Sequence, residues 1–223
     1  MSTVIRMLGA SVFLTFVVST VNAATVTQCG PTICYEYDDA QVATALYGQP
    51  TILGDMLRFL PQNFRAQSDD GDGLVTTSAS FVFDRVYSIS GNDIHKIMIT
   101  EFGDYEVTNG DRVSDELTID VASNTSSETT FDNQLFNSNG DSGGIQTWQL
   151  NGDVMVADDF SGSSGDLQVT ITNVLEAETD AFGESAWIQK KIEIMATTVP
   201  VPGAVWLLGS ALGLLGWRSR KAA

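Results

Sequence analysis

The acidic run Asp69-Asp70-Gly71-Asp72-Gly73 is the segment whose residue types could most directly bind a metal ion. Carboxylates at alternating positions among glycines are typical of the start of a calcium-binding loop, where hard oxygens surround a hard cation. The full loop also needs a glutamate at its twelfth position, and the twelfth residue from Asp70 is Phe81. Two interpretations stay open: a Ca²⁺ site at Asp69, Asp70 and Asp72, or an acidic turn without metal.

Residues that could catalyse a reaction are few. His95 is the only histidine, and no Gly-x-Ser-x-Gly segment of the kind that presents a nucleophilic serine occurs. A pair such as Glu101 and Asp104 could serve a glycosidase, but a chain with 28 acidic residues contains such pairs by chance. We therefore expect a protein that is not an enzyme and has no catalytic site or obligatory cofactor.

Two tryptophans, Trp148 and Trp187, are candidates for a sugar-binding platform. An exposed indole can stack on the apolar face of a sugar ring. Tryptophan is also a common core residue, because it buries a large apolar area. Both interpretations are kept for each residue.

The two cysteines, Cys29 and Cys34, lie close together in the sequence with Gly30-Pro31-Thr32-Ile33 between them. Gly-Pro indicates a turn. In an oxidising compartment such a pair forms a disulfide across a tight loop. The spacing excludes a Cys-x-x-Cys redox motif, and two thiols alone are too few ligands for a metal site.

The sequence divides into three parts, and the acidic residues all fall in the central one. Residues 24–198 carry all 28 Asp and Glu but only seven of the chain's 11 Lys and Arg, since Arg6, Arg218, Arg220 and Lys221 lie outside. Seven positive charges against 28 negative ones give a net charge of −21 for this part. Such a surface repels nucleic acid and anionic lipid, which excludes both as expected partners.

The elements that must position these residues are strands. Period-two alternation of apolar and polar residues indicates half-buried strands over 75–83, 117–121, 167–171 and 188–194. Further strands are expected near 24–28, 33–38, 56–60, 94–102, 105–108, 129–136 and 146–150. In the segment 188–194 we expect Ile188, Ile192 and Ile194 to face the core, with Lys191 and Glu193 on the opposite side.

The connections between these segments are rich in Asn-Gly and Gly-Asp pairs, which favour antiparallel hairpins. One short helix is expected over Asp39 to Tyr47. About eleven strands within residues 24–198 indicate an all-β fold. We expect one domain, an antiparallel two-sheet sandwich of which a jelly roll is one possible form.

Residues 1–23 have the pattern of a secretory signal peptide. Arg6 supplies the positive start, Met7 to Val18 the apolar centre, and Val21-Asn22-Ala23 the small residues before the cleavage site. Cleavage is expected between Ala23 and Ala24. The alternative, a retained membrane helix, fits less well because the apolar run is short and no basic residue follows it.

Residues 199–223 combine a proline-rich joint, an apolar run and a basic end. Val199, Pro200, Val201, Pro202, Gly203 and Ala204 lead into an uncharged stretch that ends at Trp217, before Arg218, Arg220 and Lys221. The stretch from Val199 to Trp217 has nineteen residues, close to the ~20 that span a bilayer. A transmembrane helix with its basic end in the cytoplasm is expected. The alternative is a buried core helix with a charged tail.

This C-terminal pattern resembles a PEP-CTERM sorting domain, specifically the variant with the signature Val-Pro-Leu-Pro-Ala. The resemblance covers about 25 residues; Gly203 departs from the variant's usual alanine, and the Pro-Glu-Pro acid of the main family is absent. It implies recognition and processing by an exosortase, a membrane transpeptidase-like enzyme of Gram-negative bacteria that make extracellular polysaccharide.

Together these features predict a non-enzymatic exported protein. It would be held in the inner membrane in transit and then placed at the cell surface or in the extracellular matrix, in association with polysaccharide or biofilm. The alternative is a carbohydrate-binding, lectin-like module that uses Trp148 or Trp187, with Ca²⁺ as a possible cofactor.

Overall fold

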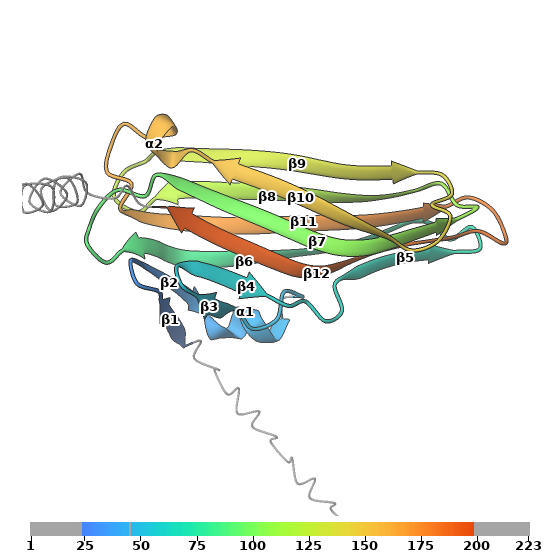
Figure 1. Cartoon of the computed structure of the whole chain (residues 1–223), viewed down its shortest axis with the longest axis horizontal. Coiled ribbons are helices and arrows are strands. Elements are labelled where there is room, and N and C mark those ends of the chain that lie inside the picture. The colour runs from blue at the N-terminus through green and yellow to red at the C-terminus, as the bar shows by residue number, and fades with distance from the viewer. Residues whose placement is uncertain (1–23, 45, 199–223) are drawn as a thin grey trace, which may run out of the picture.

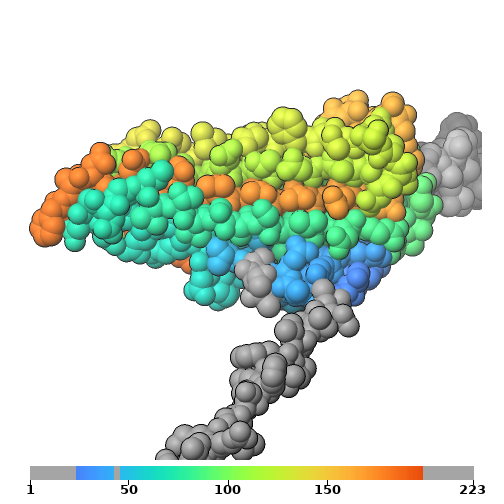
Figure 2. Space-filling view, turned by 180° about the vertical axis from the view of Figure 1, so that it is seen from behind, coloured from blue at the N-terminus to red at the C-terminus, as the bar shows by residue number. Residues whose placement is uncertain are grey.

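The computed structural model describes residues 24–44 and 46–198, which form two antiparallel β-sheets packed face to face (Figure 1). The first sheet has six strands. Their order is β1 (Thr25–Cys29), β2 (Ile33–Asp38), β6 (Gly73–Ser88), β11 (Asp166–Thr179), β8 (Arg112–Ser123) and β9 (Thr129–Asn139). Figure 2 shows the side of the molecule that this sheet covers, with β6, β11 and β8 running along the body.

The second sheet also has six strands. Their order is β10 (Gln146–Val154), β7 (Lys96–Thr108), β12 (Ser185–Thr198), β4 (Met56–Phe59) and β3 (Thr51–Leu53), with β5 (Arg65–Asp69) paired to the other half of the same edge of β12. Two short helices complete the described part, α1 (Asp39–Thr44) and α2 (Val156–Asp159).

The expected all-β, two-sheet architecture is confirmed, with differences in detail. The segments expected over 94–102 and 105–108 form one strand, β7, which continues through Gly103. The strands β3 and β5 and the helix α2 were not predicted, because all three are short and show no extended alternation. The expected helix begins at Asp39 as predicted but ends at Thr44.

Four connections cross between the two sheets at one end of the body, the right-hand end in Figure 1. They are residues 70–72, 109–111, 140–145 and 180–184. The first and last contact each other, because the backbone N–H of Asp70 donates to the carbonyl of Glu184. Asp70 has a φ of 53°, a left-handed conformation that aspartate tolerates better than most residues in a turn.

The core between the sheets is rich in aromatic side chains. Phe81 and Phe83 of β6 point inward, as the alternation predicted, and their ring centroids lie 5.0 Å apart. Tyr35, Tyr37, Tyr47 and Phe59 contact this pair, and Phe64 contacts Tyr47. Edge-to-face contacts of this kind add to the stabilisation that burial of apolar area already provides.

A β-bulge interrupts β12 in the middle of the second sheet. Lys190 pairs with Gly103 of β7, but the next paired residue is Ile192, opposite Phe102. Lys191 is therefore the extra residue. A bulge shifts the side-chain alternation by one position, so the residues after it reverse their faces.

This bulge makes the expectation for residues 188–194 wrong. Ile188 is buried, but Ile192 and Ile194 lie on the outer face, and Glu193 points into the core. Regular alternation assigned Glu193 to solvent because the pattern carries no sign of the extra residue.

The expected signal peptide, its cleavage site at Ala23, the sorting motif and the basic end lie outside the described residues, in 1–23 and 199–223. Within the described residues, no helix is long and apolar enough to cross a membrane.

Candidate functional site

A group of polar side chains lies in the middle of the sandwich, where apolar residues would be expected. All its members are 0% exposed. They are Glu101 of β7, Asp115 of β8, Asn173 of β11, Lys190 and Glu193 of β12, and Tyr47, which follows α1. We call these six residues the interior cluster. It joins the two sheets, since β8 and β11 belong to the first and β7 and β12 to the second.

Lys190 is the cation of the interior cluster. Its Nζ donates to Glu101 Oε1 at 2.6 Å, to Asn173 Oδ1 at 2.5 Å, and to Glu193 Oε2. The rings of Tyr47 and Phe64 flank the ammonium, with their centroids 4.8 and 5.6 Å from Nζ. The ammonium group is thus enclosed by acids on some sides and by aromatic rings on others.

The side-chain amide of Asn173 has both ends engaged. Its Nδ2 donates to Glu101 at 2.8 Å (Oε1) and 2.9 Å (Oε2). Its Oδ1 accepts from the hydroxyl of Tyr47 at 2.7 Å as well as from Lys190. Glu101 therefore contacts both the amide nitrogen of Asn173 and the amine of Lys190.

The interior cluster holds three carboxyl groups for one ammonium, and burial separates their pKa values. For Glu101, burial alone would raise the pKa, but the charge of Lys190 and hydrogen bonds from its neighbours outweigh burial and lower it. Burial raises the pKa of Glu193 to about 8 and that of Asp115 well above its usual range, in both cases reinforced by Glu101. At neutral pH Glu101 is the ionised acid, and the other two carry protons.

The surroundings of Asp115 agree with this assignment. Among the described residues, no nitrogen or hydroxyl donates to either of its carboxyl oxygens. A protonated Asp115 can instead donate to the neighbouring Glu101. Burial lowers the pKa of Lys190, but Glu101, Glu193 and Asp115 outweigh burial and raise it, so the amine is held as a cation.

Strand alternation places most of the interior cluster. Glu101 follows Ile97 and Ile99 on the inward face of β7, and Asn173 lies between Ile171 and Leu175 on the inward face of β11. Asp115 occupies the same phase as Leu117 on β8. Sequence reasoning missed these residues, although a polar side chain on the apolar phase of a strand is a detectable signal. Lys190 carries the same signal, because it continues the inward phase of Ala186 and Ile188 on β12. Glu193 carries none, because only the bulge turns it inward.

The catalytic pair considered from the sequence is not brought together. Glu101 is buried in the interior cluster, whereas Asp104 lies on the outer face of β7, where it forms an ion pair with Lys191. His95 lies in the segment before β7, and its backbone carbonyl accepts from Ala157.

The two tryptophans differ in their surroundings. Trp148 is 3% exposed, stacks on Phe136 at 5.7 Å between centroids and donates from Nε1 to the carbonyl of Gln189 at 3.3 Å. Its burial favours the core interpretation of the two that were kept for this residue.

Trp187 is half-buried on the outer face of β12. The guanidinium of Arg65 lies 4.3 Å from its ring centroid, and its Nε1 donates to Glu106 at 3.2 Å. A platform at Trp187 stays a prediction, with Arg65 already placed over the ring.

The acidic run lies at the turn-rich end of the body. Asp69 accepts from Ser185 and Gln67, both at 2.7 Å, and Asp70 accepts from the backbone of Gly183 at 2.9 Å. Within residues 24–44 and 46–198, no three acidic, histidine or cysteine side chains are arranged to hold a metal ion. Ca²⁺ binding at Asp69, Asp70 and Asp72 stays a prediction. The hydrogen bonds of Asp69 and Asp70 stabilise the turn, so the acidic run has a structural role without a metal ion.

The expected disulfide is present. Cys29 and Cys34 face each other across the β1–β2 hairpin, and their sulfur atoms are bonded. Cys34 is buried. The bond closes the first hairpin at the edge of the first sheet.

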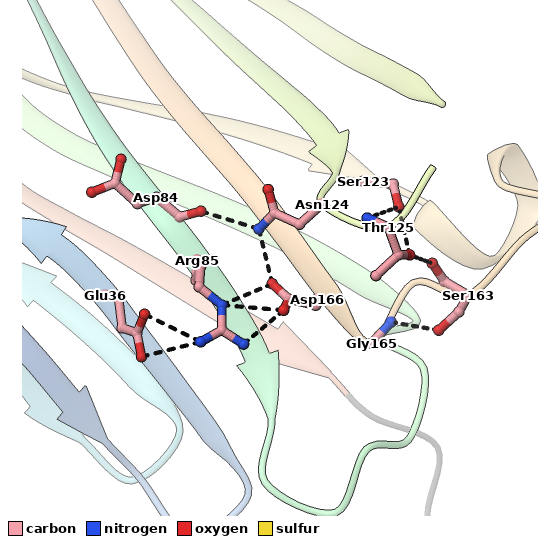
Figure 3. Close-up of polar contacts among 9 residues, drawn as sticks. All are labelled: Glu36, Asp84, Arg85, Ser123, Asn124, Thr125, Ser163, Gly165 and Asp166. Atoms are coloured by element: carbon pink, nitrogen blue, oxygen red, sulfur yellow. Dashed lines mark hydrogen bonds and ion pairs between the residues drawn. The ribbon is translucent and has the colours of Figure 1, made fainter. Parts of the chain in front are cut away.

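A second polar group lies near the ends of β6 and β8 and the start of β11, opposite the sheet-crossing turns. Figure 3 shows its contacts. Arg85 forms ion pairs with Asp166 at 2.7 Å and Glu36 at 3.4 Å, joining β6 to β11 and β2. The side-chain amide of Asn124 donates to the carbonyl of Asp84 and to Asp166. These contacts occupy the charged groups, so we interpret the group as structural.

Comparisons with known proteins give no family. No family model matches the chain, and no curated protein does. Among solved structures, one described as infectious bursal disease virus Gx strain is similar with a TM-score of 0.38 and 8% identity, over 69% of this chain and 33% of that one. The chain thus spans about a third of that structure's length.

Two further structures resemble it more weakly. One concerns the promiscuous specificity of carbohydrate-binding modules from the β-sandwich superfamily, with a TM-score of 0.20, 7% identity, and coverage of 77% of this chain and 86% of that one. The other is described as infectious bursal disease virus Gt strain, with a TM-score of 0.20, 12% identity, and coverage of 84% and 57%. None of these similarities is strong enough to bear on function.

Proposed function

We propose that this chain is a non-enzymatic exported protein of the cell surface or extracellular matrix, sorted and processed by an exosortase-type enzyme. The observation that supports the non-enzymatic part of the proposal is the placement of the interior cluster. Its titratable side chains are 0% exposed, so no dissolved substrate reaches them. In an accessible cleft, such titratable groups would suggest an enzyme. In this protein they connect the two sheets.

Two other features support export. The Cys29–Cys34 disulfide is a bond that persists in oxidising compartments. The net charge of −21 on residues 24–198 keeps an extracellular protein soluble and apart from anionic membranes. Association with polysaccharide or biofilm rests on the C-terminal resemblance.

The test addresses sorting. Replacing Pro200 and Pro202 by Ala removes the rigid extended joint that a processing enzyme would recognise, because proline restricts its own φ and the preceding residue. The apolar run and the basic end remain. We expect the variant to stay in the membrane fraction of a host with its exosortase, while the wild type is shed.

Immunoblots of membrane and medium fractions measure the result. A chain ending at Thr198 is the matched control and should appear in the medium regardless of processing. Shedding of the double variant at the wild-type rate would show that the segment is an ordinary anchor.

The lectin-like alternative depends on Trp187, the candidate tryptophan that lies on the outer face. Binding of the wild type on a glycan array, lost in Trp187→Ala, would favour this alternative over a purely structural role. Activity of the wild type on polysaccharides would contradict both.

A further inference from the structure

We propose that Lys190 and Asn173 become joined by an amide bond between their side chains, formed inside the folded core with release of ammonia. The inference goes beyond the proposed function. It concerns self-modification in a single turnover, and it does not depend on where the protein is placed in the cell.

The reacting groups are already in contact. Lys190 Nζ lies 2.5 Å from Asn173 Oδ1, the oxygen bonded to the carbon that the amine would attack. The two residues come from different sheets, β12 and β11, so the whole sandwich holds them together. Fixing two reactants in this way replaces an encounter in solution and removes much of its entropic cost.

The groups that the reaction needs surround this pair. Glu101 accepts from both the amine and Asn173 Nδ2, so it can take a proton from one nitrogen and deliver a proton to the other. The hydroxyl of Tyr47 donates to Asn173 Oδ1 at 2.7 Å, where negative charge develops during attack on the carbonyl. Glu101 touches both reacting groups and is the catalytic residue.

The steps balance as follows. The ammonium of Lys190 transfers a proton to the carboxylate of Glu101, which leaves a neutral amine with a free electron pair. That pair forms a bond to Cγ of Asn173, and the C=O π electrons move to Oδ1, which Tyr47 stabilises. Glu101 protonates Nδ2 and receives a proton from the attacking nitrogen. The C–Nδ2 bond breaks, ammonia leaves and the carbonyl re-forms.

The environment favours these steps. The interior cluster is 0% exposed, and the rings of Tyr47 and Phe64 cover the amine, so water is kept from competing as a nucleophile. Proton transfer from Lys190 to Glu101 converts a buried ion pair into two neutral groups. This conversion costs less free energy in the protein interior than in water, because a medium of low polarity solvates charges poorly. The product also removes an ammonium ion that is costly to bury.

The same residues without a bond would be a buried ion pair, and peptide mapping distinguishes the two. The protein is purified as the host releases it, reduced, denatured and digested with a protease that cleaves after glutamate. Cleavage at Glu128, Glu176, Glu184 and Glu193 puts Asn173 in peptide 129–176 and Lys190 in peptide 185–193. We expect one linked species with the mass of both peptides less one ammonia, and loss of both free peptides.

Variants assign the link. Lys190→Met removes the nucleophile and Glu101→Gln removes the proton carrier, so both should give the free peptides. Lys191→Met is the matched control, because Lys191 is the adjacent lysine, is exposed and pairs with Asp104 on the outer face. It should give the linked species as the wild type does.

The wild-type map decides the matter even where a variant fails to fold. Loss of ammonia alone is insufficient, because Asn-Gly sequences such as Asn109-Gly110, Asn139-Gly140 and Asn151-Gly152 can also lose it by cyclising. Free 129–176 and 185–193 from folded wild-type protein would overturn the proposal. So would a linked species that persists in Lys190→Met.

Discussion

At the scale of single residues, the interior of this protein holds more acid than base. Before any bond forms between Lys190 and Asn173, Glu101, Asp115 and Glu193 share the charge of Lys190, and burial raises the pKa of Asp115 and Glu193 so that these two acids keep a proton. The unfolded chain has no such requirement, because there each carboxyl is hydrated. Folding therefore takes up protons, and stability must depend on pH.

The direction follows from Glu193, whose pKa rises from 4.5 to about 8 on folding. Between those values the native state holds a proton that the unfolded state has released, so raising the pH favours unfolding. Asp115 acts in the same direction. We expect the free energy of unfolding to fall from pH 5 to pH 8, by up to about 1.4 kcal/mol per pH unit for each such group.

Thermal unfolding at constant ionic strength measures this slope. Glu193→Gln keeps an oxygen that can accept from Lys190 and removes the titrating proton, so its Tm should depend less on pH. A wild-type Tm that stays flat or rises over this range would contradict the assignment of the protonated acids.

At the scale of elements, the β7–β12 pair decides what the interior contains. Lys190 faces inward in phase with Ile188, and the bulge at Lys191 turns Glu193 to the same side. Gly103, opposite Lys190, lets the neighbouring backbone and Trp148 approach. A Cβ atom on Gly103 would lie 2.0 Å from the carbonyl oxygen of Gln189 and 2.5 Å from Nε1 of Trp148.

Gly103→Ala should therefore destabilise the protein. Forcing an extra carbon into a packed site costs about 1–3 kcal/mol, and here one of the blocking atoms belongs to the backbone. Denaturant unfolding measures the change. Lys191→Ala, an exposed substitution in the same bulge, is the control and should change stability by less than about 1 kcal/mol.

The disulfide acts on another element, the β1–β2 hairpin. Replacing Cys29 and Cys34 together by Ala should cost about 2 kcal/mol, because the closed loop is short and restricts the unfolded chain little. Hydrogen exchange should show the loss mainly in β1, which pairs with β2 at the edge of its sheet. Equal loss of protection in β7 and β11 would indicate that the hairpin contributes to global stability.

Sequence patterns predicted the elements better than they predicted the site. Alternation identified β6, β8 and β11 because apolar side chains on one face have a period of two. It failed in β12, where one extra residue reverses the alternation. The regular pattern therefore assigned Glu193 to the outer face, although Glu193 points into the core. The interior cluster was missed because Glu101, Asp115 and Asn173 are far apart in sequence, and only the sheet order brings them together. The disulfide was predicted because its residues are local.

At the scale of the whole molecule, charge repulsion is the main long-range force. Residues 24–198 carry a net charge of −21, so salt should stabilise the folded body by screening it. An increase from 10 mM to 300 mM sodium chloride should raise stability by about 1 kcal/mol, or Tm by about 2–4 °C. Differential scanning calorimetry measures it.

The same measurement separates general screening from a calcium site. At equal ionic strength, calcium chloride should raise Tm beyond sodium chloride only if Ca²⁺ binds specifically, and Asp70→Asn combined with Asp72→Asn should then abolish the excess. A lower Tm in high sodium chloride would mean that attractive ion pairs outweigh the net repulsion.

The position of β12 also determines how the body would respond to a pulling force. In a chain held by its C-terminal end, tension enters through Thr198, the last residue of β12. β12 lies between β7 on one side and β4 and β5 on the other. A pull along this strand loads the hydrogen bonds on both of its edges in shear, all at once, whereas a strand at the sheet edge would peel away one bond at a time. The fold thus places the strand nearest the tether where mechanical resistance is greatest.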